Sequence, residues 1–315
     1  MTNVPAPAPA VELDGLTRRF GALTAVDGLS LAVAPGELFG LVGPDGAGKT
    51  TTLRMLAGVL RPSAGDARLG GVSVAREPER VKHSIAYMSQ RFGLYADLSV
   101  AENLDFYADL YRVPRAERPA RLDRLYRFSA LGPFRDRLAG QLSGGMKQKL
   151  ALSCCLVHEP AILLLDEPTF GVDPISRRDL WLIVHEMVAR GTTVVASTAY
   201  MDEAERFDRL AMLHRGRLVA LDSAARLQAD FGLGMASITV DRVHEARAAA
   251  RALPGVRAAA VFGDRLHVAV ADAAADGARV AAALRAAGVA AGEATPVEPS
   301  LEDVFIERIG RAGAA

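Results

Sequence analysis

The sequence predicts an α/β fold with a mixed-sheet core, followed by a smaller α+β domain. Short apolar runs recur along the first two thirds of the chain, and segments with helical periodicity separate most of them. Runs that are continuously apolar, rather than alternating, are typical of parallel strands covered on both faces. From Met235 the composition shifts to alanine and arginine, and the predicted order of elements becomes βαββαβ, which is typical of a ferredoxin-like domain.

Chain length and net charge limit the number of domains and the classes of protein to which this sequence can belong. At 315 residues the chain exceeds the size at which a single core usually stops growing, so two domains are expected. Lys and Arg together number 37, as do Asp and Glu, and the resulting net charge of zero argues against broad binding to nucleic acid. Cys154 and Cys155 are adjacent in an apolar segment, where we interpret them as core residues.

The N-terminal segment, residues 1–10, is rich in Pro and Ala. It lacks the basic and then apolar layout of a signal peptide, so we expect a disordered tail. No uncharged apolar stretch approaches the ~20 residues that cross a bilayer. We therefore expect the chain to stay in the cytoplasm.

The first domain is predicted to span residues 11–225. Val11–Phe20 and Leu29–Val33 are predicted strands that flank a turn around Asp27-Gly28, and the turn at Pro35-Gly36 leads into the next strand. Further strands are predicted at residues 84–89, 161–165, 192–197 and 209–213. Helical patterns dominate from about residue 98 to 156, which predicts a helical subdomain at about residues 91–156.

Capping patterns mark two of the predicted helices. Ser99 is followed three residues later by Glu102, which is a capping box at the start of the helical subdomain. Ser300 and Asp303 have the same spacing and begin the final helix. This helix closes the second predicted domain, residues 226–315, which we interpret as an accessory module with a ferredoxin-like fold.

The most informative segment reads Gly-Pro-Asp-Gly-Ala-Gly-Lys-Thr, from Gly43 to Thr50, between an apolar run and an amphipathic segment. Glycines let the backbone point its N–H groups at a polyphosphate without a Cβ in the way. Lys49 adds a positive charge for the β- and γ-phosphates, and the Thr50 hydroxyl is suited to Mg²⁺. The helix that follows directs its positive end at the same anion. The segment therefore predicts a nucleoside triphosphate site.

About 120 residues after Lys49, two acidic residues follow a predicted apolar strand. The run from Ala161 to Leu165 ends in Asp166 and Glu167. A buried carboxylate is costly unless it is paired or bound to a metal. In a P-loop ATPase, the first acid would hold Mg²⁺ and the second would polarise the attacking water.

A second glycine turn, Ser143-Gly144-Gly145, opens an apolar helix about 20 residues before that strand. By itself this motif is weak, because any loop can contain it. Its position before an apolar strand that ends in two acids makes it informative, and it predicts a second helix end that binds an anion.

With these motifs in order, the chain resembles the nucleotide-binding subunit of an ATP-binding cassette (ABC) transporter over about residues 11–225. The motifs that carry the resemblance are Walker A at Gly43–Thr50, the Q-loop at Gln90, the signature at Leu142–Met146, Walker B at Leu163–Glu167 and the D-loop at Asp173. The C-terminal residues 299–305 resemble the accessory domain of exporter ATPases for drugs, antibiotics or lipids.

The resemblance implies a fold and a set of site residues. The implied fold is the P-loop NTPase ABC cassette, and the implied cofactors are ATP and Mg²⁺. The implied catalytic residues are Glu167, Gln90 and Lys49, and the implied metal ligands are Thr50, Gln90 and Asp166. The residues implied to bind ATP are Phe20, Gly43, Pro44, Asp45, Gly46, Ala47, Gly48, Lys49, Thr50, Thr51, Ser143, Gly144, Gly145 and Asp173.

The resemblance also implies partners. Two cassettes would close head to tail, so that Ser143 and Gly145 contact the nucleotide held by the other copy, as a homodimer or a heterodimer. A separate membrane permease would hold the chain at the inner face of the cell membrane, with Phe92, Leu94 and Tyr95 as the contact surface. No nucleic acid partner is expected.

Three positions depart from the family pattern. Ala199 stands where the family has a histidine that contacts the γ-phosphate, Met146 replaces the signature's glutamine, and Asp45 replaces an asparagine. A methyl group forms no hydrogen bond, so the first change predicts slow hydrolysis. The resemblance implies an ATP-binding subunit that couples ATP binding and hydrolysis to substrate export through a separate ABC permease. The alternatives are a slowly hydrolysing regulatory cassette paired with a second ATPase, which Ala199 favours, or a non-transport soluble ABC protein.

Overall fold

The computed structural model describes residues 8–91 and 93–314. Most of the predicted tail at residues 1–10, together with Phe92, lies outside these residues. The chain divides into two compact units, Met1–Tyr200 with Arg215–Arg217, and Met201–His214 with Leu218–Ala315. The domain boundaries expected from the sequence, at residues 225 and 226, stay a prediction.

The first unit contains a parallel set of strands, in the order β3-β8-β7-β6. Their bounds are Leu38–Val42 (β3), Thr193–Thr198 (β8), Ile162–Asp166 (β7) and Ile85–Met88 (β6). Every residue of β3, β7 and β8 is buried, as the continuous apolar runs predict. Because the strands are parallel, their carboxyl ends meet at one edge, where polar residues from several strands come together.

A second, antiparallel sheet of the same unit has the order β2-β1-β4-β5. Its strands are Val11–Phe20 (β1), Leu23–Val33 (β2), Ala64–Leu69 (β4) and Val72–Ser73 (β5). The predicted turn at Asp27-Gly28 is wrong, because β2 runs through these residues and the chain turns at residues 21–22. Asp27 and Gly28 together face Thr17 in a β-bulge, where Gly28 has a φ of 63° and donates its N–H to the Thr17 hydroxyl. Glycines at positive φ occur in β-bulges as well as in turns, so an Asp-Gly pair predicts either structure.

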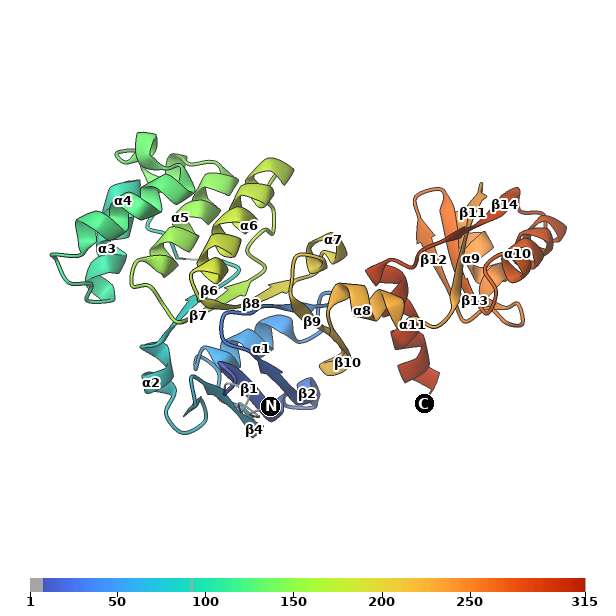
Figure 1. Cartoon of the computed structure of the whole chain (residues 1–315), viewed down its shortest axis with the longest axis horizontal. Coiled ribbons are helices and arrows are strands. Elements are labelled where there is room, and N and C mark those ends of the chain that lie inside the picture. Colours follow the sequence, from blue (N-terminus) through green and yellow to red (C-terminus); the bar gives the residue numbers. More distant parts are fainter. Residues whose placement is uncertain (1–7, 92, 315) are drawn as a thin grey trace, which may run out of the picture. The chain divides into compact units, whose positions relative to one another are not determined.

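Three helices of the first unit, α3, α4 and α5, lie in the chain between β6 and β7. The helical subdomain expected at about residues 91–156 stays a prediction. Figure 1 shows α3, α4 and α5 side by side, and α5 also contacts α6. Ser99 and Glu102 form the predicted capping box at the start of α3. Cys154 and Cys155 are buried in α5, and neither forms a disulfide. The helices are α1 (Lys49–Leu56), α2 (Pro78–Lys82), α3 (Val100–Leu110), α4 (Arg118–Ser129), α5 (Gly144–Leu156) and α6 (Pro174–Ala189), with 3₁₀ turns at Gly132–Phe134 and Ala139–Gln141.

The second unit ends in the predicted ferredoxin-like fold. Its four-stranded antiparallel sheet has the order β12-β13-β11-β14, which places the first strand of the βαββαβ unit in the middle. Val280 and Leu284 of α10 pack in the core with Ile238 of β11. The elements are β11 (Gly234–Val240), α9 (Val243–Arg251), β12 (Ala258–Phe262), β13 (Arg265–Val270), α10 (Ala275–Ala286) and β14 (Ala291–Val297).

Smaller elements complete this unit. The final helix begins with the predicted cap, in which Ser300 and Asp303 exchange backbone-to-side-chain hydrogen bonds of 3.0 and 3.2 Å. The elements are α7 (Met201–Ala204), β9 (Arg209–His214), β10 (Arg217–Asp222), α8 (Ala224–Ala229) and α11 (Leu301–Ala314). Within the described ranges, none of the helices combines the length and the apolar character that a membrane span requires.

Candidate functional site

The glycine loop from Gly43 to Thr50 joins β3 to α1, as predicted. Gly46 and Gly48 have φ values of 76° and 103°. A Cβ on Gly48 would lie 2.6 Å from the carbonyl oxygen of Ala25. The position therefore requires glycine, both because its φ is positive and because a side chain would clash with the backbone. Gly48 is also the N-cap of α1, so the loop leads directly to the positive end of that helix.

The three predicted catalytic residues meet beneath this loop. The Lys49 side chain is 4 % exposed, and its Nζ lies 3.2 Å from Oε1 of Glu167. The same Nζ donates to the carbonyl oxygens of Gly43, at 2.7 Å, and Pro44, at 3.2 Å. Gln90 donates from Nε2 to Oε2 of Glu167 over 2.8 Å. Lysine, carboxylate and amide therefore form one connected group, contributed by α1, the end of β7 and the segment after β6.

Asp166 forms a neighbouring polar cluster. Its Oδ1 accepts hydrogen bonds from the hydroxyls of Thr50 and Ser197, both at 2.9 Å, and the Tyr87 hydroxyl lies 3.3 Å from Oδ2. Asp166 is 1 % exposed, and three hydroxyl donors compensate for the burial of its carboxylate. The cluster thus combines one carboxylate with a hydroxyl beside the glycine loop.

This donor set fits Mg²⁺, which takes hard oxygen ligands and usually keeps waters and phosphate oxygens in its shell. Of the three predicted metal ligands, Thr50 and Asp166 contact each other, whereas Gln90 contacts Glu167. Among the described residues no group of three or more His, Cys, Asp or Glu side chains is arranged to hold a metal. A magnesium ion held by Thr50 and Asp166 would complete its coordination with waters and with phosphate oxygens of a nucleotide.

A cavity of ≈540 Å³ opens above these groups. Phe20 stands at its rim with a 45 % exposed side chain, and the Arg18 guanidinium lies 4.5 Å from the ring centroid. Asp45 is exposed, so its carboxylate is not forced into the loop. The lining residues are Phe20, Leu23, Thr24, Ala25, Asp45–Thr51, Gln90, Glu167 and Arg215.

Gly43 and Pro44, also predicted to bind ATP, do not line this cavity, and their carbonyl oxygens accept hydrogen bonds from Lys49. The remaining predicted ATP ligands, Ser143, Gly144, Gly145 and Asp173, form a second cluster away from the cavity. Ser143 is the N-cap of α5 and accepts a hydrogen bond from the Met146 N–H, and Asp173 is the N-cap of α6 and accepts one from the Ser176 N–H. Hydrogen bonds from the backbone and, secondarily, the side chain of Ser176 lower the pKa of Asp173. A Cβ on Gly145 would lie 2.2 Å from Oγ of Ser176, so the two helix starts pack closely.

Sequence reasoning missed three residues near the site. Tyr87 and Ser197 hold Asp166, and Arg215 lines the cavity. Burial, and secondarily the Asp166 charge, raises the pKa of Tyr87 to about 12, so its hydroxyl stays a donor near neutral pH. Tyr87 and Ser197 lie on β6 and β8, the two neighbours of β7, and a polar residue near the end of an apolar strand is the signal that could have identified them.

The parallel sheet, glycine loop and Walker-type acids define a P-loop ATPase cassette. Comparisons agree: residues 26–170 match the ABC transporter family, and residues 224–309 match the family described as ATP-binding protein DrrA1-3-like, C-terminal domain. The chain is 35 % identical over 304 residues to the daunorubicin resistance ATP-binding protein DrrA3 of Streptomyces coeruleorubidus, covering 96 % of each chain. It therefore belongs to the ABC transporter family, and the expected fold and ATPase class are confirmed.

Other relatives differ in length. The chain is 50 % identical over 211 residues to the probable multidrug ABC transporter ATP-binding protein YbhF of Escherichia coli strain K12, covering 66 % of this chain but only 36 % of YbhF. Among solved structures, one described as the ATP-binding subunit of an ABC transporter is 31 % identical, with a TM-score of 0.65, and covers 71 % of this chain and 93 % of its own. A dimeric ATP-binding cassette bound to ADP and Pi is 25 % identical, with a TM-score of 0.61, and covers 68 % of this chain and 98 % of its own.

Proposed function

We propose that this chain binds Mg-ATP in the cavity above Lys49 and hydrolyses it to drive export through a separate ABC permease. The observation that carries the proposal is the contact of Lys49 and Gln90 with opposite oxygens of Glu167. Phosphoryl transfer to water needs a cation that holds the phosphate and a group that orients the water, and Lys49 and Glu167 supply these. The Gln90 amide links Glu167 to the segment after β6.

The residues have separable tasks. Lys49 now donates to two loop carbonyls and pairs with Glu167, and these partners are exchanged for β- and γ-phosphate oxygens when the anion enters. Glu167, once released from Lys49, accepts a hydrogen bond from the attacking water and orients it. Thr50 and Asp166 would hold Mg²⁺, which neutralises charge that develops on the phosphates. Phe20 offers an exposed ring for stacking on the base.

A second cassette completes the site in this proposal. Ser143, Gly144, Gly145 and Asp173 lie outside the cavity of their own chain, at the starts of α5 and α6. The start of α5 presents backbone N–H groups that suit the γ-phosphate bound to another copy. The dimeric cassette among the similar structures supports this arrangement. Ala199 favours a heterodimer with a cassette that bears the histidine in its own site, over a homodimer with two sites that lack it.

The permease would contact a groove beside the Q-loop. A cavity of ≈310 Å³ there is lined by Gln90, Leu94 and Ala139 among others, and Tyr95 nearby is 47 % exposed. Phe92, the third residue expected on this surface, lies outside the described residues. A movement of the groove would change the position of Glu167, because Gln90 is hydrogen-bonded to it. The chain would then work in the cytoplasm, at the inner face of the membrane.

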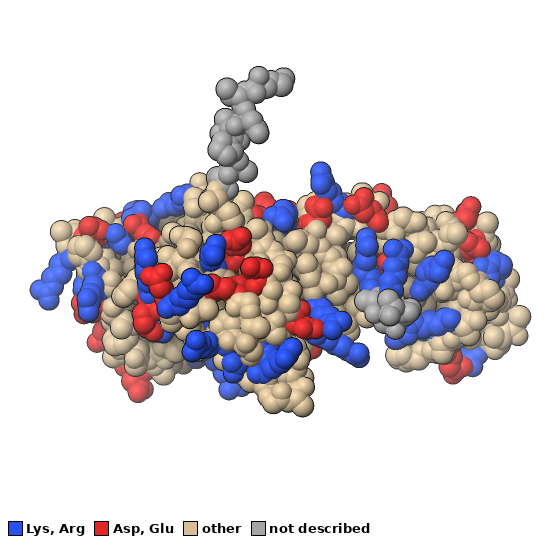
Figure 2. Space-filling model, turned by 90° about the horizontal axis from the view of Figure 1, so that it is seen from below, with Lys and Arg blue, Asp and Glu red and all other residues tan. Residues whose placement is uncertain are grey.

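Relatives named for multidrug transport and daunorubicin resistance support a drug or antibiotic as the exported substrate. Figure 2 shows acidic and basic side chains intermixed over the visible face, which supports the expectation that nucleic acid is not a partner. The second candidate function is a regulatory cassette that binds ATP and hydrolyses it slowly, and Ala199 is the observation that favours it.

Two measurements on the full chain test the proposal. Equilibrium binding of Mg-ATP should be strong for the wild type, weak for Lys49→Ala and unchanged for Lys82→Ala, whose side chain is 41 % exposed. Hydrolysis should then rise when the permease is present in a membrane. Failure to bind Mg-ATP would overturn the whole proposal, whereas binding without permease-stimulated hydrolysis would select the regulatory cassette.

A further inference from the structure

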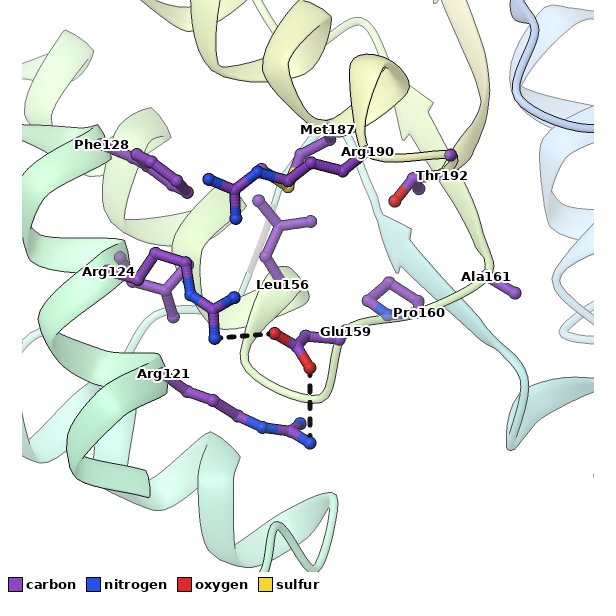
Figure 3. A pocket seen from close by; sticks show the side chains of 12 residues that line it. Arg121, Arg124, Phe128, Leu156, Glu159, Pro160, Ala161, Met187, Arg190 and Thr192 are labelled. Atoms are coloured by element: carbon purple, nitrogen blue, oxygen red, sulfur yellow. Dashed lines mark ion pairs between the residues drawn. The ribbon is translucent and has the colours of Figure 1, made fainter. Parts of the chain in front are cut away.

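A second cavity lies in the first unit, and it shares no lining residue with the nucleotide cavity. Its volume is ≈360 Å³, within the range of small-molecule sites. The walls come from α4, from the connection between α5 and β7, and from the end of α6 (Figure 3). The connection leads directly into β7, the strand that ends in Asp166.

Three arginines and one glutamate line this cavity. Arg121 and Arg124 point from α4 toward Glu159, with Nη2–carboxylate distances of 3.4 and 2.9 Å (Figure 3). Arg190 comes from the opposite side, and its guanidinium lies 4.7 Å from the ring centroid of Phe128. The side chains of Arg121 and Arg124 are only 18 % and 34 % exposed, so water screens them less than it screens a freely exposed pair.

Within the cavity lining, three guanidinium groups face a single carboxylate. Arg121 also pairs with Glu117, and Arg190 pairs with Glu186, two carboxylates that do not line the cavity. Among the described residues Arg124 pairs only with Glu159, which it shares with Arg121. A guanidinium has five donors and binds carboxylates most strongly in a bidentate manner, so Arg124 retains donors for a further anion.

The remaining wall is apolar. Leu125, Leu156 and Met187 line it with buried side chains, and Phe128 contributes a half-buried ring. Glu159 has a φ of 53°, a left-handed conformation that is strained for a residue with a Cβ. Such strain persists where the surroundings impose it, and it is frequent at ligand clamps. Here it holds a carboxylate at the mouth of an apolar cavity, between two cations.

We propose that this cavity binds a small aromatic carboxylate. The carboxylate of the ligand takes a bidentate position on Arg124, which Glu159 partly occupies in its absence. The flat ring packs between Leu156, Met187 and Phe128, on the side where Arg190 already stacks on an aromatic face. Cation and apolar wall are both required, so an anion without a ring and a ring without a charge each bind poorly.

The test uses the full chain without nucleotide and 2-naphthoate as the probe, titrated by ligand-observed NMR. We expect saturable binding with a Kd on the order of 1 mM or below. Arg124→Gln should weaken binding about tenfold, because it removes a charge-assisted pair. Glu159→Gln should tighten binding severalfold, because it removes the competing carboxylate. Arg127→Gln is the matched control: it lies on the same helix with a 68 % exposed side chain outside the cavity, and it should change nothing.

Three further measurements make the result decisive. Thermal unfolding of each variant verifies that it is folded. The neutral 2-naphthamide should bind much more weakly than 2-naphthoate, and equal binding would overturn the proposal. So would equal affinities of Arg124→Gln and Arg127→Gln, or no saturation with the wild type. Binding that disappeared in Lys49→Ala would assign the probe to the nucleotide cavity, whereas retained binding supports a separate site whether or not the chain hydrolyses ATP.

Discussion

Gln90 donates a hydrogen bond of 2.8 Å to Glu167, although 77 positions of sequence separate them. The same carboxylate pairs with Lys49 at 3.2 Å. The segment proposed to contact a permease is thus bonded to the residue proposed to orient water. A change in the position of the Q-loop would therefore alter the hydrogen bonding of Glu167.

Glu167→Gln should retain ATP binding and lose hydrolysis by about 10²–10⁴-fold, because an amide cannot act as the base. It should also stabilise a closed dimer, visible by size-exclusion chromatography with ATP. Glu205→Gln, at an exposed position, is the control and should keep the wild-type rate. Unchanged steady-state hydrolysis in Glu167→Gln would show that this residue is not the catalytic group.

Ala199→His should raise the rate of hydrolysis by about tenfold or more, because an imidazole can contact the γ-phosphate where a methyl group cannot. The measurement is steady-state ATPase activity of both proteins at saturating Mg-ATP. If the histidine brings no gain, the impairment attributed to Ala199 is wrong and Glu167 suffices.

Tyr87→Phe should raise the Mg²⁺ concentration needed for half-maximal ATP binding severalfold, since it removes a hydroxyl that lies 3.3 Å from Asp166. Binding of ATP without Mg²⁺ should stay as in the wild type. The pKa of Tyr87 is raised to about 12, so its hydroxyl stays protonated between pH 7 and about pH 9. The difference in Mg²⁺ requirement between the wild type and Tyr87→Phe should therefore be constant over that range. A pH-dependent contribution in that range would contradict a neutral phenol.

Gly145→Ala should destabilise the fold by about 1–3 kcal/mol, because its Cβ would overlap Ser176. Gly144→Ala is the matched control, since the nearest atom to its Cβ lies 3.8 Å away. Chemical denaturation of both measures the difference. Adding Ser176→Gly to Gly145→Ala should recover stability, and failure to recover would locate the cost elsewhere than in this contact.

His158 should make the folded state less stable in acid. Its Nε2 lies 3.2 Å from the Ile85 carbonyl oxygen, whereas its buried Nδ1 has no partner among the described atoms. Burial lowers its pKa below the ordinary 6.5, so below about pH 6.5 the unfolded state binds more protons than the folded one. The free energy of unfolding should fall as the pH drops through that range until the folded pKa is passed.

The control for this effect is a comparison of variants between pH 8 and pH 5. His158→Gln should show a shallower loss of stability than the wild type, and His83→Gln, at an exposed position, should match the wild type. Parallel curves for His158→Gln and the wild type would refute the assignment.

Short segments of sequence were sufficient to predict those structural features that depend on interactions between neighbouring residues. The glycine loop, the buried strand before Asp166 and Glu167, and the capping boxes at Ser99 and Ser300 are each written in fewer than about ten consecutive residues, because backbone freedom, hydrophobicity and short-range hydrogen bonds determine them. The βαββαβ order likewise predicted the sheet of the second unit. The bulge at Gly28 was mistaken for a turn because positive φ serves both structures.

The sequence by itself determined which groups this protein carries for a nucleoside triphosphate, and in which elements. Only the tertiary structure decided that Tyr87 and Ser197 hold Asp166, that Gln90 reaches Glu167, and that arginines from α4 and from the C-cap of α6 line a separate cavity beside Phe128. These contacts join residues far apart in the chain, and their distances depend on how strands align and helices pack, which no short segment specifies.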